Sequence, residues 1–139
     1  MADTVTGPTI LQQNDNRVVI KMVVQSDGTG STTVMGDVSA LTARNDGTAV
    51  AHLGLLRVWY SCQGGDGGNS FARLDEEDSD GDIPILRLTG AGYWDFREFG
   101  RVAADKSSNS NQSDVNFVVP STADSGNMYT VIAEFQKIY

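Results

Sequence analysis

RVVIKMVVQ, residues 17–25, alternates between two faces with the period of a β-strand. One face of such a strand carries four apolar side chains, Val18, Ile20, Met22 and Val24. The β-branched content also favours a strand, because branched side chains pack well on a pleated surface. The flanking segments NDN (14–16) and SDGTG (26–30) are rich in turn-forming residues. We therefore predict a strand over 17–25.

The same period returns in the rest of the chain. In residues 128–137, MYTVIAEFQK, alternation predicts Tyr129, Val131, Ala133 and Phe135 on the inner face and Thr130, Glu134 and Gln136 on the outer face. Further strands are expected over 31–38, 49–62, 70–74, 83–89 and 115–119. Short strands separated by turn signals predict an all-β fold, a single-domain antiparallel β-sandwich or jelly roll spanning residues 1–139.

Segment 49–62, AVAHLGLLRVWYSC, is the most apolar run and has two interpretations. A buried helix would place Leu53, Leu56 and Tyr60 on one stripe. Gly54 and the cluster Val58-Trp59-Tyr60 favour a strand instead. Because both alternating faces are largely apolar, we expect a central strand covered on both sides.

Composition restricts the classes of function. The chain has 139 residues, 40% of them hydrophobic, and a net charge of −8. Its ten Lys and Arg are scattered singly, so we expect no basic patch and no binding of nucleic acid. The single cysteine, Cys62, cannot form an internal disulfide. The N-terminal residues have neither a basic region nor a long apolar run, so we expect no signal peptide, no membrane span and a protein that is made and used in a cytoplasm.

The acidic stretch Asp75 to Asp82 contains six carboxylates in eight residues. With Gly81 at the sixth position of an EF-hand loop, Glu76, Asp78 and Asp80 take the first, third and fifth. The twelfth position needs a bidentate Glu and holds Arg87, and the flanks resemble strands rather than helices. We predict a solvated hairpin tip that holds no structural metal. Weak calcium binding in a loop of another type remains the alternative.

Two further features of the sequence bear on catalysis. His52 is the only histidine and lies ten residues before Cys62, so a Cys–His nucleophilic pair is conceivable. A lone histidine on an apolar strand is more often a packed, hydrogen-bonded core residue, and Cys62 a small hydrophobe. The segment Gly64 to Gly68 lacks the Lys-Ser/Thr pair of a phosphate loop. We predict no catalytic residue and no cofactor.

The segment GAGYWDFREFG, residues 90–100, interleaves four aromatic residues with charged ones. Exposed rings beside carboxylates would suit a sugar, with Tyr93, Trp94 or Phe96 as the stacking surface. Asp95 and Glu98 are the carboxylates of a conceivable glycoside hydrolase. The expected role is structural: Trp94 and Phe96 share one side of a strand and fill one end of the sandwich with aromatic bulk.

Three stretches together resemble a known family: ADTVTGPTILQQNDNRVVIKMVVQSDGTG (2–30), GAGYWDFREFG (90–100) and DVNFVVPSTADSGNMYTVIAEFQK (114–137). The chain is similar, nearly end to end, to small β proteins encoded among the structural genes of tailed bacteriophages. The resemblance implies a non-enzymatic virion structural protein, a capsid decoration or cement protein. Members often have a glycine-rich stretch after the aromatic segment, where this chain has Lys106 to Ser113.

The resemblance also implies partners. We expect the chain to bind the major capsid protein or another virion protein, as a homo-oligomer. Residues 1–11 are expected to form an extended N-terminal arm, in which Thr4 to Leu11 lies along a neighbour as an added strand. The polar residues Lys106 to Ser113 are expected to face solvent. A glycan-binding module displayed on a particle is the alternative function.

Overall fold

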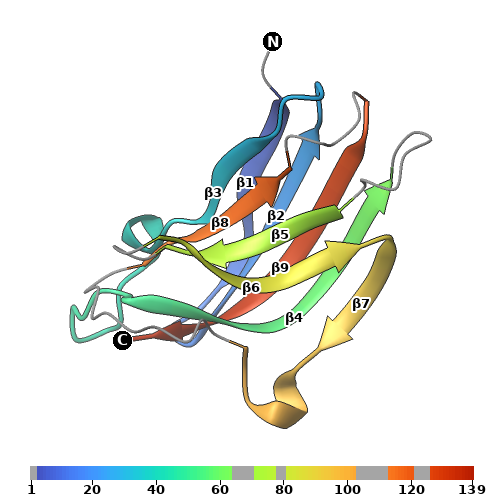
Figure 1. Ribbon diagram of the computed structural model, residues 1–139. Coiled ribbons are helices and arrows are strands. Elements are labelled where there is room, and N and C mark those ends of the chain that lie inside the picture. Colours follow the sequence, from blue (N-terminus) through green and yellow to red (C-terminus); the bar gives the residue numbers. More distant parts are fainter. Residues whose placement is uncertain (1–2, 64–70, 78–80, 103–112, 121–125) are drawn as a thin grey trace.

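The computed structural model describes residues 3–63, 71–77, 81–102, 113–120 and 126–139. Two antiparallel sheets pack face to face (Figure 1). The five-stranded sheet has the order β1 (Thr4–Gln13), β2 (Arg17–Gln25), β9 (Met128–Ile138), β4 (His52–Gln63) and β7 (Ala91–Asp95). The four-stranded sheet has the order β3 (Ser31–Gly36), β8 (Val115–Val119), β5 (Phe71–Glu76) and β6 (Ile83–Thr89). The prediction of an all-β sandwich is confirmed.

The connectivity of the strands is that of a jelly roll with one strand added. From β2 onward the strands pair as a wrapped hairpin: β2 with β9, β3 with β8, β4 with β7 and β5 with β6. The pairs β4–β9 and β5–β8 join these ribbons into two sheets. At the innermost turn Gly90, with a φ of +70°, passes the chain from β6 directly to β7 in the other sheet. β1 extends the five-stranded sheet beyond β2.

The core lies between the sheets, where their inward faces meet in one cluster of buried side chains. The alternation predicted for β2 and β9 is confirmed: the inward residues of both strands are at most 1% exposed. Phe117 of β8 meets Tyr129 of β9 edge-on, with ring centroids 6.4 Å apart. This geometry suits the charge distribution of aromatic rings and connects the two sheets at their centre.

Several elements differ from the sequence-based expectations. Residues 4–13 are not a free arm; they form β1, which pairs with β2 along its length. β3 ends at Gly36 because the Asp37 side chain accepts hydrogen bonds from Ser39 and starts a short 3-10 turn, Val38–Ala40. The strand predicted over 49–62 is observed as β4 but begins only at His52, and its outer face is covered only in part, because Trp59 is 37% exposed.

The segment after β7 returns to β4 and partly covers its outer face. Phe96 donates a backbone hydrogen bond to Leu56, and Val102 pairs with Leu55 in an isolated bridge. Between them a single 3-10 turn, Arg97–Phe99, projects from the sandwich below β7 (Figure 1). Arg101 covers Gly54, where an added Cβ would clash with the Arg101 Cδ. Glycine at position 54 thus lets this side chain pack onto the strand.

Candidate functional site

The outer face of the five-stranded sheet carries two neighbouring rows of side chains that cross the strands. Because the strands pair antiparallel, residues that face each other across the ladders line up, even though β1–β2 and β4–β9 contain register shifts. One row consists of Gln12, Val19, Glu134, Arg57 and Asp95. The next row consists of Thr9, Lys21, Ile132, Trp59 and Tyr93. Polar groups and large rings from strands distant in sequence therefore share one surface.

Glu134 lies at the centre of the first row and is held by two arginines. Its Oε2 accepts a hydrogen bond of 3.1 Å from Arg57 Nη2, and its Oε1 lies 3.5 Å from Arg17 Nη1. Its side chain is only 7% exposed. The outward orientation predicted for Glu134 is correct, but the arginines cover it. The Glu134 carboxylate raises the pKa of the Arg57 guanidinium above its usual value, chiefly through this hydrogen bond.

The second row contains a stacked pair of aromatic rings. The rings of Trp59 and Tyr93 have centroids 4.9 Å apart and planes inclined by 26°. The Arg57 guanidinium lies 4.9 Å from the Trp59 ring centroid, within reach of a cation–π interaction. Arg57 therefore joins the carboxylate of one row to the aromatic ring of the other.

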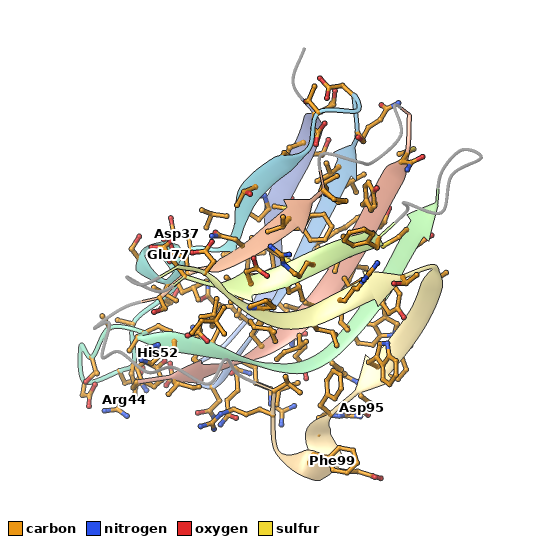
Figure 2. The ribbon with its side chains drawn as sticks, viewed as in Figure 1. Asp37, Arg44, His52, Glu77, Asp95 and Phe99 are labelled. Atoms are coloured by element: carbon orange, nitrogen blue, oxygen red, sulfur yellow. The ribbon has the colours of Figure 1, made fainter. Side chains whose placement is uncertain are left out.

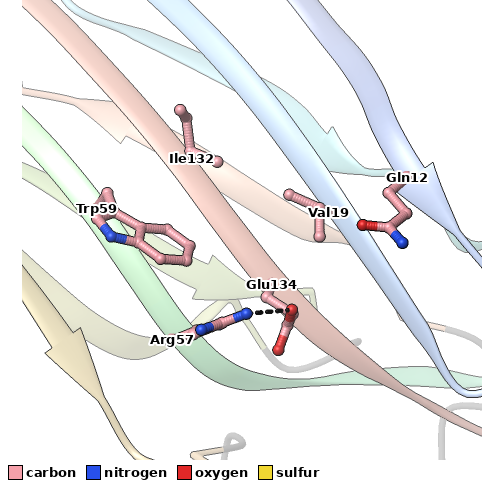
Figure 3. Close-up of a pocket in the computed structure, with 6 residues that line it drawn as sticks. All are labelled: Gln12, Val19, Arg57, Trp59, Ile132 and Glu134. Atoms are coloured by element: carbon pink, nitrogen blue, oxygen red, sulfur yellow. Dashed lines mark hydrogen bonds and ion pairs between the residues drawn. The ribbon is translucent and has the colours of Figure 1, made fainter.

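A groove of about 470 Å³ runs over β9 and β2, between Trp59 and Gln12 (Figure 3). Ile132 and Val19 form an apolar floor, Trp59 and Arg57 stand on one side, and Gln12 stands on the other. The Arg57–Glu134 contact crosses the floor between these walls. Its volume falls within the range of about 300–1,000 Å³ that is usual for ligand pockets. An adjoining hollow of about 240 Å³ shares four of these residues and adds Arg17.

The aromatic segment 90–100 does not fill one end of the core as expected. Trp94 faces inward from β7, but β7 is an edge strand, and Trp94 stays 50% exposed. It stacks on Phe96 with centroids 6.0 Å apart, and its Nε1 donates a hydrogen bond of 3.0 Å to the Tyr60 hydroxyl. Of the four aromatic rings of segment 90–100, Phe96 alone packs partly against the core. Phe99 is 81% exposed at the tip of the projecting turn (Figure 2). The prediction that Trp94 is a buried core residue is wrong.

Asp95 is saturated by local partners. Its carboxylate accepts bonds from the backbone N–H, Nε and Nη2 of Arg97 and from the Tyr93 hydroxyl. The hydrogen bonds from Arg97 lower the pKa of Asp95 well below its usual range. A general acid of a glycosidase needs a raised pKa. The geometry therefore gives Asp95 the role of ordering the turn rather than that of a proton donor beside Glu98.

The acidic stretch is divided between strand and loop. Asp75 and Glu76 belong to β5 and are each 2% exposed, so the prediction that these carboxylates are solvated is wrong. Asp75 accepts two hydrogen bonds from the Arg73 guanidinium, of 2.6 and 2.9 Å. Asp82 accepts one from Asn116. Asp78 and Asp80 lie outside the described residues, and among those described no three His, Cys, Asp or Glu side chains cluster to hold a metal ion.

His52 and Cys62 do not form a nucleophilic pair. They lie at the two ends of β4, about 33 Å apart at a rise of about 3.3 Å per residue. His52 is half-buried at one end of the sandwich (Figure 2), and its Nδ1 is 3.4 Å from Oε1 of the buried Glu76. Cys62 is buried, and desolvation raises the pKa of its thiol to about 11. A raised pKa makes the thiol a poor nucleophile, in agreement with its interpretation as a small core residue.

Two predicted loops lie wholly or mostly outside the described residues. Gly64 to Gly68 is one of them. The other is Lys106 to Ser113, of which only Ser113 is described; it is buried, and its N–H bonds to the Ala51 carbonyl. No helix in the described part of the chain combines the length and apolar character that a membrane span requires.

The groove was not predicted from the sequence. Its residues come from β1, β2, β4 and β9, and no local spacing joins them. The one available signal was the alternation of the strands, which places Val19, Glu134 and Trp59 on the outer face of the sheet. Comparison of the chain with protein-family models, with curated proteins and with solved structures finds no match.

Proposed function

We propose that this chain is a non-enzymatic structural protein of a tailed-phage virion, a decoration or cement protein that binds the head and stabilises it. The observation that carries the proposal is the free edge of β1. Within the described residues β1 pairs on one side only, with β2, and its other edge is open.

This edge lacks the charged side chains that usually keep edge strands apart, although Pro8 and two register shifts interrupt its pairing with β2. Natural edges are protected by charges, and Lys is common among them. None of the ten residues of Thr4–Gln13 is charged, although the chain as a whole carries 28 charged residues, ten basic and eighteen acidic. Ile10 and Leu11 are 41% and 52% exposed on this strand. An open, uncharged and partly apolar edge is the feature that strand addition by a partner uses.

The surface next to β1 offers a place for the partner's side chains. A hollow of about 110 Å³ lies beside the strand, lined by Pro8, Ile10, Met35 and Leu41 among others. Strand addition supplies affinity through the backbone, and pockets for alternate side chains supply specificity. The partner is the major capsid protein, another virion protein or a further copy of this chain in a homo-oligomer.

Cementing works through many weak contacts. A modest interface repeated over a shell gives a large combined effect, because each bound module raises the effective concentration of the next contact. The resemblance of residues 2–30, 90–100 and 114–137 to phage structural proteins supports this role. Jelly rolls also occur in viral capsid and lectin domains, which is an analogy of fold alone.

The test uses heads of the phage that encodes the chain, stripped of it and then reconstituted with purified protein. Leu11→Lys places a charge on the open edge while leaving the core untouched. The variant should bind stripped heads weakly and fail to raise the temperature of genome release. Met128→Lys is the matched control: Met128 is 47% exposed and lies at the start of the central strand β9, away from the open edge. This variant should bind as the native chain does. Equal binding of both variants would place the contact elsewhere.

A glycan-binding module is the second candidate function. The observation that favours it is the exposure of Trp59, Tyr93 and Trp94, three rings that a purely structural role would bury. Exposed rings with polar groups around them suit a ligand with both apolar faces and hydroxyl groups. A saccharide array probed with the purified chain tests this function independently of head binding.

A further inference from the structure

We propose that the groove over β2 and β9 is a binding site for an acidic saccharide, a sugar that carries a carboxylate. The inference rests on the second candidate function, display of a glycan-binding module, and does not depend on attachment to the head. It follows from a charge distribution that the sequence does not reveal.

The fold gathers basic residues around a surface of an acidic protein. Arg17 and Arg57 line the groove and the hollow that adjoins it, and Arg97 lines a further hollow that also contains Arg17. The carboxylates among them are Glu134 and Asp95, so three positive and two negative charges leave one positive charge. Lys21, in the row beside Ile132, adds a second. The whole chain carries −8, whereas the charged side chains that line the groove and its two neighbouring hollows sum, with Asp95 and Lys21, to +2.

The carboxylates of this face are already occupied. Asp95 is saturated by Arg97 and Tyr93, and Glu134 is 7% exposed between two arginines. Arg17 makes only one contact of 3.5 Å with Glu134 and is 51% exposed, so most of its donors remain available. A guanidinium presents parallel N–H groups that match a carboxylate, and such charge-assisted pairs are stronger than neutral hydrogen bonds. Arg17 is therefore the anchor for an anionic group.

The rest of the groove suits the body of a sugar. Val19 and Ile132 provide an apolar floor for the C–H face of a ring, with the exposed Trp59 beside it (Figure 3). The Gln12 amide, which makes no hydrogen bond to the described residues, stands opposite and offers a donor and an acceptor to hydroxyl groups. A protein partner would have to bury these charges, whereas hydroxyl groups can satisfy them.

The net charge distinguishes a compact ligand from a polyanion. At physiological ionic strength charges are screened beyond about 8 Å. A single carboxylate in the groove therefore responds mainly to Arg17, Arg57 and Glu134, whose charges sum to +1. A nucleic acid extends beyond the groove and meets the acidic surface of the remaining protein, which repels it.

The experiment measures binding of the full chain by titration calorimetry. The probes are 3′-sialyllactose and a hyaluronan tetrasaccharide, with lactose and chitotetraose as neutral counterparts and a single-stranded oligonucleotide as a polyanion. At least one carboxylated probe should bind at least tenfold more tightly than its neutral counterpart, and its affinity should fall as salt is added. Arg17→Gln should weaken that binding about tenfold or more, which corresponds to loss of one charge-assisted hydrogen bond.

Arg44→Gln is the matched control. Arg44 is 46% exposed, close to the 51% of Arg17, but its guanidinium pairs with Asp46 in a turn. Its substitution should leave binding unchanged. Equal affinity for neutral and carboxylated probes, or for the Arg17→Gln variant, would overturn the acidic-saccharide inference and leave the glycan-binding function standing. Absence of binding to every saccharide would overturn both, as would preferential binding of the oligonucleotide.

Discussion

Replacing Trp94 by alanine should leave the protein folded, although a tryptophan in an apolar segment is usually a core residue. The Trp94 side chain is 50% exposed and contacts Phe96 and Tyr60 at the edge of the sheet. An aromatic side chain of roughly 250 Å² that is half covered removes about 125 Å² from water. At about 25 cal/mol per Å² this corresponds to about 3 kcal/mol, and residual burial in the unfolded chain lowers it to about 2 kcal/mol.

Phe117→Ala provides the comparison from the centre of the core. Phe117 is 1% exposed and packs edge-on against Tyr129. Deleting a buried aromatic side chain costs about 3–5 kcal/mol, because the cavity adds to the loss of burial. Total stabilities are about 5–15 kcal/mol, so this variant should unfold at much lower urea concentration or fail to fold.

The assay is urea unfolding followed by far-ultraviolet circular dichroism, which does not depend on the deleted indole. We expect Trp94→Ala to keep the native m-value and lose only a minor part of the free energy of unfolding. Trp94→Phe, which retains the stack on Phe96, should lose less still. If Trp94→Ala were as destabilising as Phe117→Ala, the indole would be buried, and the argument for an exposed aromatic edge at β7 would be refuted.

Three further outcomes follow from the environments of single groups. Burial raises the pKa of Cys62 to about 11, so iodoacetamide should not label the folded chain at pH 8, and rapid labelling would contradict this. Because the unfolded thiol loses its proton at lower pH than the folded one, the free energy of unfolding should fall between about pH 9 and pH 11. Arg97→Gln should raise the pKa of Asp95 toward its usual value, which a carboxyl NMR titration of both chains measures. In the native chain the lowered pKa of Asp95 stabilises the fold at any pH above the usual pKa of an aspartate, and this contribution is lost as the pH falls below that value. Glu134→Ala should cost about 2–3 kcal/mol in thermal melts, because it leaves the partly buried Arg57 without its partner, and a loss as small as that of an exposed ion pair would show that the carboxylate is not shielded.

The strands with a clear period of two were predictable because burial alone decides their pattern. β2 and β9 each bury one face against the same core, so the alternation of Val18 to Val24 and of Tyr129 to Phe135 is visible in the sequence. β8 was also predicted with its observed bounds, although its burial does not alternate. The sequence left open whether the strands pair as a jelly roll or as another sandwich, because this depends on which distant strands become neighbours.

The predictions from local sequence pattern were wrong for the edge strands and for the buried carboxylates. The sequence predicts an extended arm at residues 1–11 and a core position for Trp94, whereas both belong to edge strands, whose side chains are incompletely covered whatever their hydrophobicity. Asp75 and Glu76 were expected in solvent, but both are buried. Asp75 pairs with Arg73, and Glu76 lies beside His52. A carboxylate is tolerated there because it is paired, and its partner is chosen by the fold.

The central claim is that the chain is a component of the virion head. The most direct test is to purify heads of the encoding phage by density gradient and to quantify this chain against the major capsid protein by mass spectrometry. Many weak contacts repeated over a lattice predict many copies per head, in a constant ratio to the capsid protein across preparations. Purified infectious virions whose heads lack the chain, or carry it only in traces and in varying amounts, would contradict the account.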